Sequence, residues 1–538
     1  MLCRKYIVAD TTFIIISIVF VVFAYLGNAD LTPNGIGLDS DLQNYTQILE
    51  WGKQPALFTH DPLAHTFDYF PGLPNLMTTI AGFFSGETYQ TLLKAGAVSI
   101  FIFLLTFYIL GRYLFTKPSI AALLAVIMSI NVTWAYGTFW GATHSDPVPR
   151  ILASAIFPLI LLCGIYFNRN ILIKCLLMVT CGLAIGIHSI TGVALGAMFF
   201  FPFLMINTKI LSLNTIKNGI ILGISFLMPA LVIIKNMHLP QSNLTETDIY
   251  NLKKIWNFRF EQDFSDLIGS LLSKIYLYFV EKPIFTFSII CLLFIYIKRN
   301  LLAEKVKILL KYNILFIIGL VIILLFVTFE MSISNKIGRI QISSDLLRGT
   351  KFLIPICWFF VITAVYIVDK KINIAVPILI ITITAIFCFS IDKQILAVRH
   401  LIAKSTNIEM IESPKAQKMI KKNNEKLEAL LELKSIVPSD SLVFTDIPDM
   451  SIRYFCHIPL FPVKQDGDNL YFDNDIENGL QWLKVMLLLY SVPPRAHEAW
   501  VASEAQYYFS NSSDCQNLPE DIGKILYSKN NWSICSRN

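Results

Sequence analysis

Long apolar segments recur along the first 391 residues, and they constrain this chain more than any other feature. A helix needs about 20 apolar residues to cross a bilayer. Only 15% of the 538 residues are charged and 55% are hydrophobic, which is too little charge to cover the surface of a soluble protein. The pattern predicts an α-helical polytopic membrane protein with about eleven spans. The expected spans are residues 11–26, 91–111, 118–136, 150–167, 171–187, 190–206, 217–234, 283–297, 312–329, 351–368 and 373–391.

Basic residues between these segments predict how the chain is oriented in a membrane. Cytoplasmic loops are enriched in Lys and Arg, and here the alternate short connections carry them. The N-terminus is therefore expected in the cytoplasm of a multi-pass membrane protein, with the loop of residues 27–90 and the C-terminal region outside. The basic residues on the cytoplasmic side are Arg4, Lys5, Arg112, Lys117, Arg169, Lys174, Lys209, Lys217, Lys298, Arg299, Lys305, Lys307, Lys370 and Lys371.

One apolar segment, Leu73–Phe84, is too short to cross a bilayer. Pro71, Pro74 and Gly86 flank or interrupt it. If it crossed, every later basic connection would move to the outer side. We therefore expect a re-entrant or interfacial helix within the first outer loop.

The composition becomes charged after residue 391, where the apolar domain of residues 1–391 ends. Residues 392–434 are expected to form a helical linker, with a helix over Met410–Leu433. Residues 435–538 predict a small extracytoplasmic α/β domain with strands at Ser441–Thr445 and Pro459–Val463 and a helix at Gly479–Tyr490. Cys515 and Cys535 could form a disulfide in such a domain, although Cys456 would then be left over.

The first outer loop contains Asp39 and Asp41, the first candidates for catalysis. Residues two apart in an extended backbone project to the same side, so both carboxylates could address one target. They could hold a divalent cation such as Mg²⁺ or Mn²⁺ against a phosphate, or one could act as a general base. The simpler alternative is that Asp39 caps a helix that begins near Asp41.

Further along the same loop, Asp61, His65 and Asp68 have helical spacing. At positions i, i+4 and i+7 they would share one helix face, which could bind a metal or provide an acid/base pair. An ordinary polar surface helix explains the same spacing.

Several polar residues stand where other apolar segments begin. Arg150 opens a span after His144 and Asp146, and His188 lies at a tight turn between helices. An outward-facing guanidinium could grip a lipid phosphate, or it could simply extend to the membrane interface. His188 alone could equally be a structural residue.

A basic cluster lies in a short outer loop, against the usual charge distribution. Phosphate or diphosphate binding would explain positive charge on that side. The cluster consists of Lys336, Arg339, Arg348 and Lys351.

The sequence also argues against several functions. No span has a charged residue near its middle, unlike ion-coupled transporters, and there is no nucleotide-binding or zinc-protease motif. The formal net charge of +6 is small for this length and does not indicate nucleic-acid binding.

This arrangement resembles the GT-C superfamily of membrane glycosyltransferases, in which a first span leads to an external loop with an essential Asp. Asp39 and Asp41 match that loop. The chain also looks like bacterial polytopic proteins distantly related to the superfamily. That similarity lies in Pro149-Arg150, in Gly186–Gly192 around His188, in Gln341–Arg348, in Arg453–Lys464 and in Gln481-Trp482.

The resemblance implies a polyprenyl-phosphate-linked sugar donor, transfer outside the cytoplasm with an Asp as base, and a divalent metal in some members. On this hypothesis the protein lies in the bacterial cytoplasmic membrane. Asp39 and Asp41 are its catalytic candidates, and the acceptor is a glycan, lipid or protein. The expected substrate-binding residues are Arg150, His188, Arg339, Arg348, His65 and His144. The alternatives are a non-catalytic binding or translocation protein for lipid-linked glycan, and an O-antigen polymerase or ligase.

Overall fold

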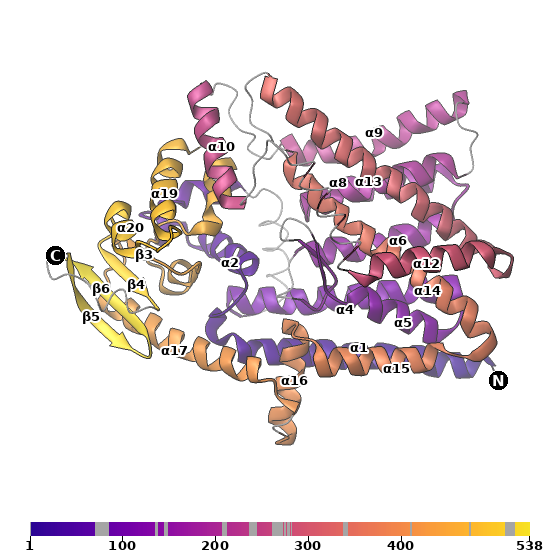
Figure 1. Ribbon diagram of the computed structural model, residues 1–538, viewed down its shortest axis with the longest axis horizontal. Coiled ribbons are helices and arrows are strands. Elements are labelled where there is room, and N and C mark those ends of the chain that lie inside the picture. Colours follow the sequence, from indigo (N-terminus) through magenta and orange to yellow (C-terminus); the bar gives the residue numbers. More distant parts are fainter. Residues whose placement is uncertain are drawn as a thin grey trace.

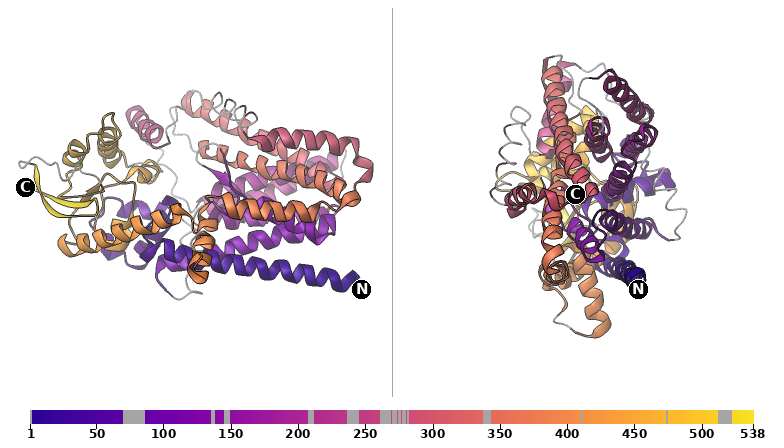
Figure 2. Two further views of the ribbon diagram at one scale, coloured as in Figure 1. Left: turned by 60° about the horizontal axis from the view of Figure 1, so that its bottom comes forward. Right: turned by 90° about the vertical axis from the view of Figure 1, so that its right-hand side faces the viewer.

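The computed structural model is mostly helical, with a bundle of apolar helices at one end and a smaller unit containing a sheet at the other (Figure 1). Figure 2 shows the two parts end to end, with the first helix running along the side of the bundle. The structure describes residues 2–69, 86–134, 138–144, 149–206, 212–235, 245–260, 269, 273, 276, 280, 282–336, 343–408, 411–472, 475–511 and 522–538.

Each of the predicted apolar segments contains a helix. Among the described residues, six helices are long and apolar enough to cross a membrane, or seven if α15 and α16 (Lys393–Thr406), bent by 82°, are one broken span. The helices are α1 (Leu2–Leu31), α4 (Thr88–Phe115), α5 (Pro118–Ser129), α6 (Pro149–Tyr166), α7 (Ile171–Leu183), α8 (Ser189–Met205), α9 (Leu213–Lys235), α12 (Pro283–Ile297), α13 (Glu304–Lys336), α14 (Leu353–Ile372) and α15 (Ala375–Phe389).

The predicted count of about eleven spans is therefore not confirmed. Four of these helices, α5, α7, α8 and α12, are apolar but fall below the length of a full crossing. The sequence could not show this, because apolar residues continue past the point where a helix ends. After α5, for example, the chain turns into β1 (Val132–Thr133), which pairs with β2 (Phe139–Trp140).

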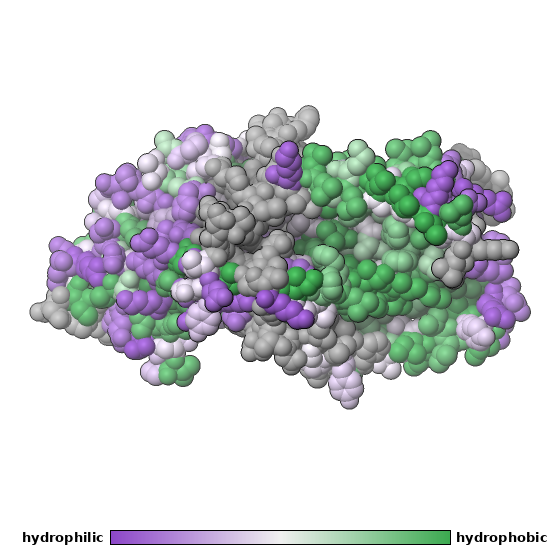
Figure 3. All heavy atoms as spheres, turned by 90° about the horizontal axis from the view of Figure 1, so that it is seen from above, coloured by the Kyte–Doolittle hydropathy of each residue, from purple (hydrophilic) through white to green (hydrophobic). Residues whose placement is uncertain are grey.

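The surface of the bundle fits a helical, multi-pass membrane protein. Figure 3 shows a hydrophobic band over the bundle, with hydrophilic residues over the C-terminal unit and at the far end of the bundle. Large apolar side chains on several helices point outward, among them Ile16, Leu227, Leu325 and Ile381. Exposed apolar area of this extent is unusual on a soluble monomer and is expected against lipid.

The predicted basic connections gather at one end of the bundle. Arg112, at the end of α4, donates to Asp10 of α1 at 2.7 Å. Lys117, before α5, donates to Asp369 at the end of α14, also at 2.7 Å. The N-terminal part of α1 and these two helix connections therefore lie at the same end of the bundle, and the side of the membrane that they face stays a prediction.

The C-terminal unit is built on a four-stranded sheet in the order β3-β4-β6-β5. The strand predicted at Ser441–Thr445 is confirmed as β3. The strand predicted at Pro459–Val463 is wrong, since only Leu460 forms a bridge, with Val443. Pro459 and Pro462 have no backbone N–H, so a longer ladder cannot form. The strands are β3 (Val443–Thr445), β4 (Tyr507–Ser510), β5 (Gly523–Lys529) and β6 (Trp532–Arg537).

Helices surround this sheet and join it to the bundle. The predicted linker contains α16 and α17, and Ala429, Leu430 and Leu433 of α17 belong to the core of the C-terminal unit. The helix predicted at Gly479–Tyr490 is confirmed as α19. The elements are α10 (Glu246–Phe260), α17 (Pro414–Ile436), η10 (a π-helix, Ile452–Cys456), η11 (Lys464–Asp466), α18 (Gly467–Phe472), α19 (Ile476–Leu489) and α20 (Ala496–Ser503).

The first outer loop folds into short helices that lie between the bundle and the C-terminal unit. The predicted re-entrant helix at Leu73–Phe84 lies outside the described residues. Cys535 is disulfide-bonded, but Cys515 is also outside the described residues, so that pairing stays a prediction. The remaining short elements are η1 (Pro33–Gly35), α2 (Ser40–Lys53), η2 (Pro55–Phe58), η3 (Ala64–Tyr69), η5 (Ala184–Gly186), η7 (Arg299–Leu301) and η8 (Ser344–Phe352).

Candidate functional site

Four elements distant in sequence meet where the bundle faces the first outer loop: the start of α2, the start of α6, the turn before α8, and η8. Their charged side chains form what we call the polar cluster. Electrostatic effects between its members show that they are close in space. Its members are Asp39, Asp41, Arg150, His188, Arg348 and Lys351.

Asp39 and Asp41 lie at the N-terminus of α2, and both carboxylates interact with the guanidinium of Arg150. Asp39 is the N-cap, and its side chain accepts a hydrogen bond from the backbone N–H of Leu42 at 3.0 Å. Asp41 lies in the first helical turn and forms an ion pair with Arg150. Asp39 also acts electrostatically on Arg150. The helix cap is therefore confirmed, whereas a cation or substrate as the shared target of the two carboxylates stays a prediction.

Arg150 is fixed by its place at the start of α6. Pro149 stands at the first position of the helix. A backbone N–H there would have no acceptor within the helix, so the lack of an N–H in proline costs no hydrogen bond. The guanidinium carbon lies 4.2 Å from the ring centroid of Phe139. The side chain of Arg150 is 15% exposed, against 47% for its partner Asp41. The arginine is thus held on an aromatic face while the carboxylate stays accessible.

Lys351 is the most unusual charge in the cluster. Its side chain is 1% exposed, and it has no hydrogen bond or ion pair among the described residues. Its electrostatic neighbours are Arg150 and Arg348, which repel it. Arg348 itself lies 3.6 Å from Asp345. Burial and the two arginines disfavour the charged form of Lys351, so an anion bound beside it would stabilise the ammonium that lacks a counter-ion among the described residues.

His188 adds an uncharged donor to the same cluster. It caps α8, and its Nδ1 accepts the backbone N–H of Thr191 at 3.2 Å. Burial, together with the charges of Lys351 and Arg150, lowers the pKa of His188 well below its usual value. The ring is therefore neutral at pH 7, and because Nδ1 is an acceptor, its proton lies on Nε2.

The other predicted substrate-binding residues lie elsewhere. His144 is separated from Arg150 by the ring of Phe139. That ring contacts His144, at 4.5 Å between ring centroids, and it also packs against the guanidinium of Arg150. His65 lies 2.9 Å from Asp475 of the C-terminal unit and does not reach the cluster. Arg339 is outside the described residues.

The metal or acid/base face predicted for Asp61, His65 and Asp68 is wrong for the two residues whose side chains are described. Asp61 precedes the short helix η3 and is buried, and its carboxylate accepts from Nε of Arg453 at 2.7 Å. His65 turns instead toward Asp475. The helical spacing misled because Asp61 lies before the short helix η3, so Asp61 and His65 do not share one helix.

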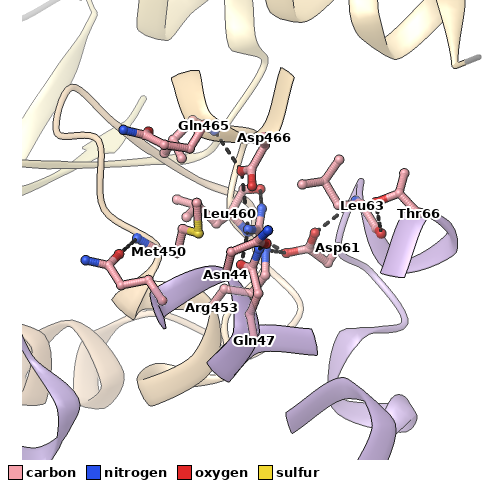
Figure 4. Close-up of polar contacts among 12 residues, drawn as sticks. Asn44, Gln47, Asp61, Leu63, Thr66, Met450, Arg453, Leu460, Gln465 and Asp466 are labelled. Carbon is pink, nitrogen blue, oxygen red and sulfur yellow. Dashed lines mark hydrogen bonds and ion pairs between the residues drawn. The ribbon is translucent and has the colours of Figure 1, made fainter. Parts of the chain in front are cut away.

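Arg453 organises a buried network between the first outer loop and the C-terminal unit (Figure 4). Besides Asp61, it donates to Gln47 of α2 at 2.7 Å and to Asp466 at 3.3 Å. Its fourth contact is the backbone oxygen of Leu460, at 3.0 Å. Burial alone would lower the pKa of Arg453, but the two carboxylates outweigh it and raise that pKa.

The described residues do not form a ready metal site. Nowhere in the described ranges do three or more His, Cys, Asp or Glu side chains gather around one point. Asp39 is used as a helix cap and Asp41 is paired with Arg150. Mg²⁺ and Mn²⁺ prefer several converging oxygen ligands, so these two carboxylates alone do not provide the set that the prediction required.

Neither the models of known protein families nor the curated protein sequences give a match to this chain.

Proposed function

We propose that this protein is a membrane glycosyltransferase that transfers a sugar from a polyprenyl-phosphate-linked donor to an acceptor outside the cytoplasm. The observation that carries the proposal is the buried side chain of Lys351, which has no counter-ion among the described residues and lies near Arg150 and Arg348, next to the exposed carboxylate of Asp41. The proposal includes a GT-C-like bundle in a bacterial cytoplasmic membrane and a cytoplasmic N-terminus.

The polar cluster has the features of a phosphate site. Two guanidiniums and an ammonium supply charge-assisted donors, and the neutral ring of His188 supplies an N–H without adding charge. A phosphate placed beside Lys351 would give that ammonium the counter-ion it otherwise lacks among the described residues. Because the cluster lies at the end of the apolar bundle, the anion is expected on a lipid headgroup.

An apolar groove beside the bundle suits the lipid part of such a donor. It has a volume of about 440 Å³ and lies between α1, α4, α5, α15 and α16. Thr143 lines it, and the next residue, His144, packs on Phe139. The ring of Phe139 also forms a cation–π contact with the guanidinium of Arg150. A polyprenyl chain in this groove would therefore end close to the polar cluster.

The chemistry requires one base and one stabilised leaving group. The oxygen of an acceptor hydroxyl attacks the anomeric carbon, and the bond from that carbon to the phosphate oxygen breaks. The phosphate leaves with the electron pair and is stabilised by Arg150, Arg348 and Lys351. The hydroxyl proton passes to Asp41, whose carboxylate becomes available when the phosphate competes for Arg150.

The test compares cell-envelope glycans from a deletion strain rescued with wild type, Asp41→Asn or Asp39→Asn protein at matched levels. Asp39→Asn tests the second candidate carboxylate, which Asn can replace as a helix cap, and Asp440→Asn, in an exposed turn outside the cluster, is the matched control. We expect Asp41→Asn to behave like the deletion, losing one sugar and accumulating its lipid-linked donor. Restoration of the glycan by Asp41→Asn would remove the catalytic role and leave a binding or translocation protein.

A further inference from the structure

A second concave site lies in the C-terminal unit, where the first outer loop touches it. This cavity has a volume of about 160 Å³. Its apolar wall includes Pro62, from the first outer loop, and Phe461. Its polar wall is formed by Asn478 and Gln481 of α19 and by Glu504, which follows α20. We call it the amide pocket.

The polar groups of the amide pocket have unused hydrogen-bonding capacity. Neither the side-chain amide of Gln481 nor the carboxylate of Glu504 has a partner among the described residues. Asn478 donates through its amide nitrogen to Asp475 at 2.7 Å, which leaves its side-chain oxygen as an acceptor. One carboxylate, one amide oxygen and one complete amide therefore line a small cavity beside an aromatic ring.

The lining predicts the class of ligand. Amides and carboxylates can form hydrogen bonds with neighbouring hydroxyl groups. An amide offers both a donor and an acceptor, and a carboxylate offers two acceptor oxygens. The ring of Phe461 and the apolar face of Pro62 suit the C–H face of a pyranose. No Lys or Arg lines the pocket and Glu504 is negative, so a phosphorylated or acidic ligand would be repelled.

A chain of contacts joins the wall of the amide pocket to α2, the helix whose first turn contains Asp41. Pro62 follows Asp61, and Asp61 and Gln47 of α2 share the guanidinium of Arg453. Gln47 lies six residues along α2 from Asp41, a rise of about 9 Å. Neither Asp41 nor any other member of the polar cluster lines the pocket, so a ligand that occupied both places would extend beyond the pocket.

We propose that the amide pocket binds an uncharged sugar ring of an extended acceptor glycan, one or more residues away from the hydroxyl that reacts. This assignment as an acceptor subsite rests on the proposed transferase. The sugar-binding step itself needs only the pocket, so it can be measured without turnover.

The experiment is saturation-transfer NMR on the full-length protein in detergent, with the methyl glycosides of glucose, galactose, mannose and N-acetylglucosamine as probes. The test variants are Gln481→Leu and Glu504→Gln, which change the two groups that have no partner among the described residues. Lys484→Gln, on the exposed face of the same helix, is the control. We expect transfer to at least one glycoside in wild type and in Lys484→Gln, and at least a fivefold loss in the two pocket variants.

Two results would overturn the proposal: no transfer to any probe, or transfer that both pocket variants retain. Asp41→Asn separates this proposal from the transferase, because it should leave probe binding unchanged while envelope transfer is lost. If probes bind but Asp41→Asn stays active, the catalytic assignment fails and the pocket remains. If Asp41→Asn is inactive but no probe binds, the pocket assignment alone fails.

Discussion

Arg453 and Asp61 form an ion pair at 2.7 Å in which each side chain is only 1% exposed. The two residues are 392 positions apart, so this contact joins the first outer loop to the C-terminal unit. A second link lies nearby, where the backbone N–H of Met450 donates to Gln43 of α2 at 2.8 Å. The loop that carries Asp41 is therefore shaped by residues near the other end of the chain.

Arg453→Met should strongly destabilise the protein. It leaves the carboxylates of Asp61 and Asp466 buried without their cation, and loss of one partner of a buried pair costs about 3–5 kcal/mol. The measurement is denaturant unfolding in detergent. The control is Arg495→Met, because Arg495 and its partner Glu498 are 50% and 59% exposed and such pairs contribute at most about 1 kcal/mol. Equal losses in the two variants would contradict a network held by burial.

Lys351→Met should have opposite effects on stability and binding. Removing a buried ammonium that has no counter-ion among the described residues should raise the free energy of unfolding by at least about 1 kcal/mol. Loss of a charge-assisted contact should weaken binding of a polyprenyl phosphate probe by roughly tenfold to a hundredfold. Lys371→Met, at the exposed end of α14 and outside the basic cluster, is the control. A variant that is destabilised and still binds the probe normally would contradict the anion site.

The sequence predicted the residues of the polar cluster better than it predicted their surroundings. Asp39, Asp41, Arg150, His188 and Arg348 were expected on one side of the chain, and they lie near one another at one end of the bundle, because charge in an apolar chain is confined to the ends of its helices. The lack of a partner for Lys351 among the described residues could not be seen, since burial depends on which helices pack together.

The contacts of the first outer loop could not be predicted from the sequence, for a related reason. Asp61 and His65 have a helical spacing, and only the fold shows that they face Arg453 and Asp475. The spacing of nearby residues cannot indicate a contact between side chains that are about 400 positions apart. The amide pocket is a further case, since Pro62 and Gln481 come together only after the C-terminal unit has folded against the loop.

Asp39→Ala and Asp39→Asn should differ in stability, which separates the capping role of Asp39 from its charge. The Ala variant loses the bond to the Leu42 N–H and should cost about 1 kcal/mol, whereas Asn can replace that bond at little cost. Unfolding in detergent measures both, with Asp440→Ala in an exposed turn as the control. Equal stability of the two Asp39 variants would show that the cap contributes nothing.

His188 should make the protein less stable in mild acid. Burial, with the positive charges of Lys351 and Arg150, lowers its folded-state pKa, so the unfolded chain binds the proton more readily. The stability contributed by the neutral ring is complete above the unfolded pKa of about 6.5 and is lost as the pH falls below it. The slope should approach about 1.4 kcal/mol per pH unit.

His188→Asn tests this pH dependence, because Asn can still cap α8 but does not titrate in this range. Unfolding curves in detergent at pH 7.5, 6.5, 5.5 and ~5 should show a shallower loss of stability for His188→Asn than for wild type, with equal slopes above pH ~7. His60→Asn, which changes an exposed histidine outside the cluster, should keep the wild-type slope. If His188→Asn also kept it, the ring would not be held neutral by the cluster, and its place as an uncharged donor beside Lys351 would have to be abandoned.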